Sequence, residues 1–186
     1  MRTEWILAAV LAALLIGAIA LFNRLVRQRN LVREGWSGID VQLKRRSDLI
    51  PNLVETVKAY AAHERGVLEE VTARRAASAG VSAVPDKAQA ERALQGAVGK
   101  LMAVAEAYPA LKADQNFRAL QDQLAEIEDE LQMARRYYNG TVRDLNTLIQ
   151  SFPSNLLAGA FGFHPEHFFE LDDKAAAAAP TIAFGG

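Results

Sequence analysis

Residues 117–149 read FRALQDQLAEIEDELQMARRYYNGTVRDLNTLI and decide the fold class. Apolar side chains recur there at alternating steps of three and four, at positions 117, 120, 124, 127, 131, 134 and 138, and the series continues through 142, 145 and 149. Such spacing places one apolar stripe along an α-helix and is typical of helices that pack in a bundle. We therefore predict a long amphipathic helix that ends before Pro153.

The same spacing recurs on the N-terminal side of this helix. We predict a helix that ends before Pro51, because the residue before a proline is disfavoured in helices, a second helix at residues 53–71, a loop at 76–85 and a third helix at 94–108. Helices of this length with short connections pack antiparallel. The predicted fold is all-α, an elongated antiparallel bundle of about four long helices.

The N-terminal segment, residues 5–22, reads WILAAVLAALLIGAIALF and contains no charged side chain. Its length is close to what an α-helix needs to cross a bilayer. A secretory signal peptide is the competing interpretation, but its apolar region is shorter and a small-x-small cleavage site follows it, whereas Phe22-Asn23-Arg24 follows here. We predict a transmembrane anchor at residues 1–23, a helical domain at 24–153 and a tail at 154–186.

Basic residues dominate the stretch that follows this segment. Between residues 24 and 46 the sequence contains seven basic side chains and only two acidic ones, Glu34 and Asp40. We name the seven the basic collar: Arg24, Arg27, Arg29, Arg33, Lys44, Arg45 and Arg46. Positive residues beside a span stay in the cytoplasm, which predicts an outside N-terminus and a cytoplasmic domain. The collar is also expected to contact anionic lipid or a partner protein; an ordinary solvated charged face stays open as an alternative.

Composition argues against most kinds of catalysis. The chain has no cysteine, which excludes disulfides, zinc ribbons and thiol nucleophiles. A net charge of −1 gives no attraction to nucleic acid. His164 and His167 form a weak metal motif because Pro165 interrupts the helix that would align them, and the adjacent His63 and Glu64 point about 100° apart on a helix. We predict no catalytic residue, metal or cofactor.

The stretch WSGIDVQLKRRSDLIPNLVETVKAYAAHE at residues 36–64 resembles the signature block of the LemA family. Further matches are AEAYPALKA at residues 105–113, Tyr138-Asn139, Phe152-Pro153 and Phe169-Glu170. The resemblance implies a bacterial inner-membrane protein with one N-terminal span and a cytoplasmic helical domain. It implies no reaction, and it suggests a loose link to membrane stress or membrane protein quality control.

Four polar residues lie beside apolar stripes: Glu64, Arg135, Asn139 and Asn146. A buried carboxylate needs a partner, and for Glu64 we expect Arg135 or Arg46. Asn139 and Asn146 are expected to bridge helices and fix their register, although a wet helix face explains both equally well.

Apolar residues beside the collar and in the C-terminal region suggest contacts with other chains, and packing against the domain itself stays open as the alternative. We assign the contacts with other chains to Trp36, Ile39 and Leu43 beside the collar, to Phe161, Phe163, Phe168 and Phe169, and to Ile182 and Phe184 in the tail. The tail is either a short binding motif or a disordered end.

These observations favour a non-catalytic membrane scaffold or adaptor that forms a homo-oligomer and engages other inner-membrane proteins. The alternative is a module that binds or shapes anionic lipid through the basic collar.

Overall fold

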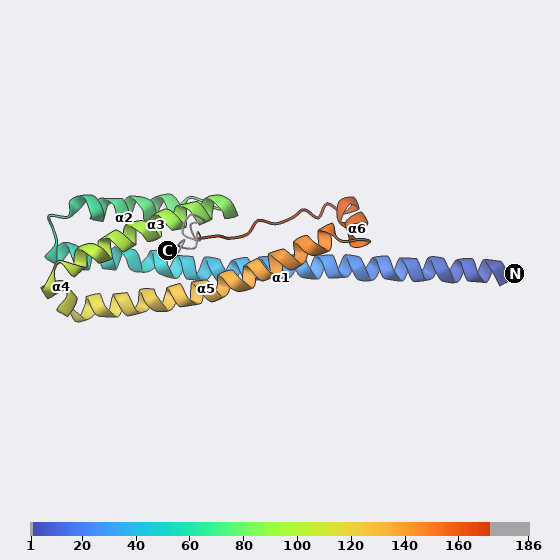
Figure 1. The fold of residues 1–186 in the computed structure, drawn as a ribbon, viewed down its shortest axis with the longest axis horizontal. Coiled ribbons are helices and arrows are strands. Elements are labelled where there is room, and N and C mark those ends of the chain that lie inside the picture. The colour runs from blue at the N-terminus through green and yellow to red at the C-terminus, as the bar shows by residue number, and fades with distance from the viewer. Residues whose placement is uncertain (1, 172–186) are drawn as a thin grey trace, which may run out of the picture. The chain divides into compact units, whose positions relative to one another are not determined.

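The described part of the chain is helical. The computed structural model describes residues 2–171, in which six helices and no strand occur: α1 (Arg2–Tyr60), α2 (Arg65–Ala79), α3 (Val84–Glu106), α4 (Pro109–Ala113), α5 (Gln115–Gln150) and α6 (Ser154–Ala160) (Figure 1). The predicted all-α class is confirmed. The helix predicted at residues 117–149 is α5, and the prediction missed its ends by only one or two residues.

The chain divides into two compact units. Unit 1 contains the residues up to Arg46 together with Ala125–Phe168, and unit 2 contains Ser47–Leu124 and, among the described residues, 169–171. Helices α1 and α5 therefore each contribute one part to unit 1 and the other part to unit 2. Helix α6 belongs to unit 1, although its residues lie in the predicted tail.

Unit 2 has an apolar core to which five helices contribute. The end of α1 contributes Leu53 and Val57, which pack with side chains of α2, α3, α4 and the first part of α5. Helices α2 and α3 lie side by side and antiparallel (Figure 1). The buried side chains of this core are Ile50, Leu53, Val57, Ala61, Leu68, Val71, Leu94, Ala97, Leu101, Ala105, Leu111, Phe117 and Leu124.

The prediction that a helix ends before Pro51 is wrong, because α1 continues through Pro51 to Tyr60. A proline inside a helix has no N–H to donate to the carbonyl four residues earlier, which here belongs to Ser47. The guanidinium Nε of Arg75, on α2, donates to that carbonyl oxygen at 2.7 Å instead. An unsatisfied backbone acceptor is costly, so a side chain of another helix supplies the missing donor.

The helix predicted at residues 53–71 is divided by a turn. Helix α1 ends at Tyr60, and α2 begins at Arg65. The turn contains neither Gly nor Pro, and the apolar spacing continues across it. Buried Ala61 and a hydrogen bond from the Tyr108 hydroxyl to Glu64 at 3.3 Å hold the turn against the rest of unit 2. Local pattern alone therefore gave no sign of it.

In unit 1, α1 packs closely against the second part of α5. A Cβ atom added at Gly35 would lie 3.1 Å from the Cα atom of Tyr138, so the absence of a side chain permits this approach. The Trp36 and Tyr138 rings lie 5.5 Å apart, and Gln28 donates to the Thr141 carbonyl at 3.3 Å. Among the glycines of the described residues, Gly35 is the one at which another helix approaches most closely.

Candidate membrane-facing site

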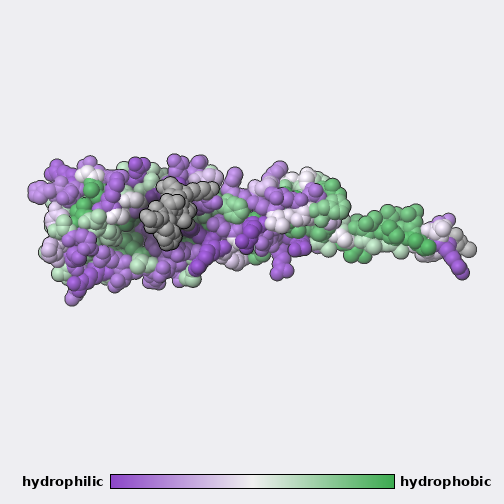
Figure 2. Space-filling view, in the orientation of Figure 1, coloured by the Kyte–Doolittle hydropathy of each residue, from purple (hydrophilic) through white to green (hydrophobic). Residues whose placement is uncertain are grey.

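The first part of α1 is apolar on every side and exposed. Trp5, Leu14 and Ile16 each expose two thirds or more of their surface, and Figure 2 shows this stretch as a continuous hydrophobic surface. Within residues 2–171, α1 is the one helix that is long and apolar enough to cross a membrane. A helix that is hydrophobic on all sides is normally buried in a protein core or in a membrane. The described residues do not cover this one.

The residues of the basic collar differ in exposure. Its exposed members are Arg24, Arg27, Arg33, Lys44 and Arg45. Arg29 is half-buried, and its guanidinium lies 4.8 Å from the centre of the Phe163 ring, a cation–π distance. The exposed members therefore remain accessible to an anionic surface, whereas Arg29 contributes to packing within unit 1.

Arg46 is buried and paired with an acidic residue of α5. Its side chain is 2% exposed, and it donates to Glu128 on α5 at 2.6 Å. A buried charge needs such a partner. The guanidinium is covered by residues of its own chain, which argues against the predicted contact of Arg46 with lipid or a partner.

The apolar segment ends beside α6. The ring of Phe22 lies 4.9 Å from that of Phe161 and 6.0 Å from that of Phe163, both edge-on. Gly162 turns the chain between these two rings with a φ of 68°, which glycine adopts without strain, and the amide of Phe163 closes the helix end on the Ala158 carbonyl. A left-handed glycine with this bond is a common helix ending.

Two of the proposed contact residues beside the collar are fully covered. Ile39 and Leu43 are buried within unit 1, and Trp36 is half-buried against Tyr138. Their burial within the chain argues against an open contact strip at this point. Within unit 1 and beyond the apolar segment, the exposed large apolar side chains of α1 and α5 are Val41, Met133 and Tyr137.

The segment after α6 is fixed to α5 by backbone contacts. Asn146 donates to the Glu166 carbonyl at 2.9 Å and accepts from the Glu166 amide at 2.8 Å. The buried Tyr138 hydroxyl donates to the His167 carbonyl at 2.8 Å. Burial, with a smaller effect of the Glu166 charge, raises the pKa of Tyr138 to about 12. Asn146 therefore binds an extended segment, whereas a bridge between helices was expected.

The phenylalanines of the C-terminal region fall into two groups. Phe163 and Phe169 are buried, whereas Phe161 and Phe168 are exposed. Ile182 and Phe184 lie outside the described residues, so their proposed contact role stays a prediction.

Glu64 has a partner different from those expected. Its carboxylate accepts a hydrogen bond from the Tyr108 hydroxyl, and the expected pairing with Arg46 or Arg135 stays a prediction. Burial and the nearby Glu64 charge raise the pKa of Tyr108. Arg135 and Asn139 line a recess of about 400 Å³ on α5, together with Arg136, Gly140, Arg143 and Phe168. No acidic residue lines this recess, which therefore favours an anion electrostatically.

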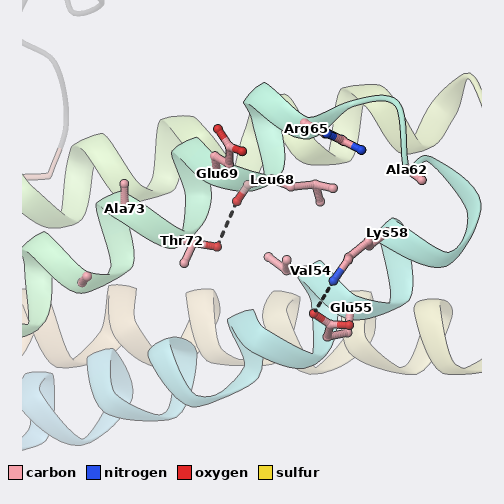
Figure 3. A pocket seen from close by; sticks show the side chains of 10 residues that line it. Val54, Glu55, Lys58, Ala62, Arg65, Leu68, Glu69, Thr72 and Ala73 are labelled. Carbon is pink, nitrogen blue, oxygen red and sulfur yellow. Dashed lines mark hydrogen bonds and ion pairs between the residues drawn. The ribbon is translucent and has the colours of Figure 1, made fainter.

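A second hollow lies in unit 2, between the end of α1 and α2. It measures about 760 Å³, and Val54, Leu68 and Ala73 line it together with charged side chains (Figure 3). Lys58 pairs across one helical turn with Glu55 at 3.4 Å. The lining offers no nucleophile paired with a base, and no group of three or more potential metal ligands occurs among residues 2–171.

The comparisons with known proteins identify the family. A model described as LemA family matches residues 35–184. The chain belongs to the LemA family. This confirms the resemblance in the sequence, and it places the α1–α5 contact at Gly35, the buried Arg46 and the C-terminal segment all inside the LemA domain.

Three curated relatives are similar over most of the chain. Magnetosome protein MamQ 2 of Paramagnetospirillum magneticum is 26% identical in an alignment 187 positions long that covers 87% of this chain and 68% of the relative. MamQ of Magnetospirillum gryphiswaldense is 24% identical over 92% of this chain and 72% of its own length. Protein LemA of Metamycoplasma hominis is 24% identical over 81% of this chain and 69% of its own length. Neither these names nor the family description states a reaction.

The sequence analysis missed several residues that shape this site. Phe22 packs against Phe161 at the end of the apolar segment, Phe152 and Leu156 are exposed on and beside α6, and Glu128 neutralises Arg46. The phenylalanines after Pro153 were a usable signal for Phe161, the partner of Phe22. No local signal marked Glu128, because its partner lies 82 residues away in sequence.

Proposed function

We propose that this LemA-family protein is a non-catalytic scaffold or adaptor of the bacterial inner membrane. Residues 5–22 of α1 cross the bilayer, and the same helix continues without a break into the cores of both compact units. The single observation that carries the proposal is this exposed apolar segment joined by one helix to a LemA domain. A connection through one helix holds the domain at the membrane, where it meets membrane-bound partners.

The orientation follows from the exposed collar. Arg24, Arg27 and Arg33 are exposed immediately after the segment, and basic residues beside a span favour the cytoplasmic side. The LemA domain is therefore cytoplasmic in this proposal, and the N-terminus lies outside. A reporter that works only in the periplasm, fused after Gly186, is expected to be inactive, and a cytoplasmic reporter there active. Activity of the periplasmic reporter contradicts the orientation.

Self-association is the second part of the proposal. Met133 and Tyr137 lie one turn apart on α5, and both are about half exposed. Confinement to a membrane raises the effective concentration of copies, so weak contacts are populated. Native mass spectrometry of the full chain in nanodiscs is expected to show oligomers, and the pair Met133→Ser with Tyr137→Ser is expected to shift them toward the monomer. Gln132→Ala, an exposed neighbour, is the control, and a monomeric unmodified chain contradicts self-association.

The alternative function is recognition of anionic lipid. Five exposed collar residues and the arginine-lined recess favour it. Native mass spectrometry that counts anionic lipids retained by the extracted protein tests it. Arg24→Gln with Arg27→Gln is expected to lower retention strongly at low salt and weakly at high salt; unchanged retention contradicts the alternative. A role in membrane stress or protein quality control stays a prediction that neither experiment addresses.

A further inference from the structure

Three large apolar side chains around α6 are exposed together. Phe152, Leu156 and Phe161 expose 81%, 64% and 59% of their surface; we call these three residues the α6 patch. The opposite side of α6 packs on unit 1, because Ser154 and Ala158 are almost fully buried. The exposed surfaces of the three patch residues are therefore not covered by this packing. Large exposed apolar groups that lie together mark a surface for another apolar phase.

The α6 patch lies where the apolar segment of α1 ends. Its member Phe161 contacts Phe22, the last residue of that segment, with ring centres 4.9 Å apart. The first charged side chains after Phe22 are the exposed Arg24 and Arg27. An apolar surface that continues from a span and stops at arginines matches the boundary between acyl chains and headgroups.

The chemistry of the surrounding chain suits that boundary. From residue 145 to residue 163 the sequence contains no charged side chain, so contact with the acyl region desolvates no ion. The Ser154 hydroxyl donates to the Leu148 carbonyl at 2.6 Å, and the amides of Phe161 and Phe163 bond to carbonyls within α6. These backbone groups are satisfied without water, as entry into the membrane interface requires.

We propose that α6 is a second membrane contact, which lies in the interface of the leaflet beside α1 and inserts the α6 patch among the acyl chains. The occupant of the patch is lipid. This inference rests on the proposed span of α1 and adds to it a contact that fixes the rotation of unit 1 about the anchor. A single span leaves that rotation free, whereas two adjacent contacts restrict which face of unit 1 is turned toward the bilayer.

The absence of cysteine allows a direct test. The full chain, carrying one cysteine labelled with a nitroxide, is placed in nanodiscs of phosphatidylcholine and phosphatidylglycerol. Relaxation by oxygen, which concentrates in lipid, is compared with relaxation by a water-soluble nickel chelate. The test positions are Leu156→Cys and Phe152→Cys. The controls are Leu14→Cys, inside the apolar segment, and Gln123→Cys, an exposed polar position on α5.

The proposal predicts that labels at 156 and 152 are several-fold more accessible to oxygen than to the nickel chelate, and are shallower than the label at 14. A label at 156 that behaves like that at 123, while 14 is in lipid, overturns the inference and leaves the span intact. A label at 156 shielded from both reagents means that protein covers the patch, which also overturns it. A label at 14 exposed to the nickel chelate overturns the span and the inference together. Helical circular dichroism of each labelled chain confirms its fold.

Discussion

Two regions of helix α1 use apolar residues in opposite ways. Residues 5–17 are apolar on all sides and exposed on all sides, whereas Leu25, Ile39, Leu43 and Leu53 form one buried stripe among polar neighbours. The stripe has neighbours in the chain, from α5 in unit 1 and from α2 and α3 in unit 2. The difference teaches that the pattern around the helix axis, and not its hydrophobicity alone, identifies the medium that covers it.

The largest expected effect comes from charging the exposed region. Leu11→Arg with Leu15→Arg is expected to raise the free energy of membrane insertion by about 6 kcal/mol, since each central arginine costs about 3 kcal/mol. Alkaline carbonate extraction is then expected to release the variant from membranes. Asn30→Arg with Ser37→Arg, both at exposed positions beyond the segment, is expected to stay in the pellet. Equal extraction of the two variants contradicts the distinction between the regions.

The same substitution in each region compares them directly. Ile39 is fully buried and Ile16 is 67% exposed. Ile39→Ala is expected to lower the free energy of unfolding by about 3 kcal/mol, through lost burial and a cavity. Ile16→Ala is expected to change it by less than about 0.5 kcal/mol. Denaturation in mild detergent, followed by circular dichroism, measures both, and similar losses at the two positions would mean that the exposed region packs on protein.

Tyr138, on the α5 side of the contact with α1, makes the free energy of unfolding depend on pH. The pKa of Tyr138 is raised to about 12 in the folded chain, above its ordinary value of about 10. The folded state therefore keeps the proton to higher pH than the unfolded state does. Its contribution, about 2–3 kcal/mol, is fully present below pH 10 and is lost as pH rises toward 12.

Denaturation at a series of pH values from 9 to 12 measures this loss. Tyr138→Phe is expected to flatten the decline over that range, although it also removes the hydrogen bond to His167. Tyr60 and Tyr108, whose pKa values are raised as well, remain in both chains and contribute equally. A decline of the same steepness in the variant shows that Tyr138 is not its source.

The smallest expected effects concern two glycines three residues apart in α1. A Cβ at Gly35 meets the backbone of Tyr138 at 3.1 Å, whereas a Cβ at Gly38 meets nothing within 4 Å. Gly35→Ala is expected to lower the free energy of unfolding by about 1 kcal/mol, because overpacking against a helix backbone outweighs the gain in helix propensity. Gly38→Ala is expected to raise it by about 0.5–1 kcal/mol. Stabilisation by both substitutions would show that the contact at Gly35 is loose.

Sequence patterns predicted what depends on neighbours along one helix. The spacing of Phe117, Leu124 and Leu131 indicated α5, and all three side chains are buried. The failures share a cause, since each depends on a distant residue. Helix α1 passes Pro51 because Arg75 supplies a donor, and the turn before α2 is held by Tyr108. Arg46 is covered through Glu128. Periodicity contains no information on such pairs.

Helix α6 was missed for a different reason. It is 7 residues long, too short for a periodic stripe to be recognised, and its exposed apolar residues contradict the usual rule that apolar side chains lie inside. The density of phenylalanine was noticed, but it was assigned to contacts between proteins. The contact of Phe161 with Phe22 is what relates that density to the end of the apolar segment.

The substitute donor at Ser47 has a consequence for biosynthesis. Arg75 is made 28 residues after Ser47, which at ribosomal rates is a delay of about 1–6 s. During that interval the apolar segment is already complete and α1 still has an open carbonyl one turn before Pro51. The nascent helix lacks this hydrogen bond until α2 has emerged and docked. Order of synthesis thus allows the anchor to reach the membrane while the region around Pro51 is still pliable.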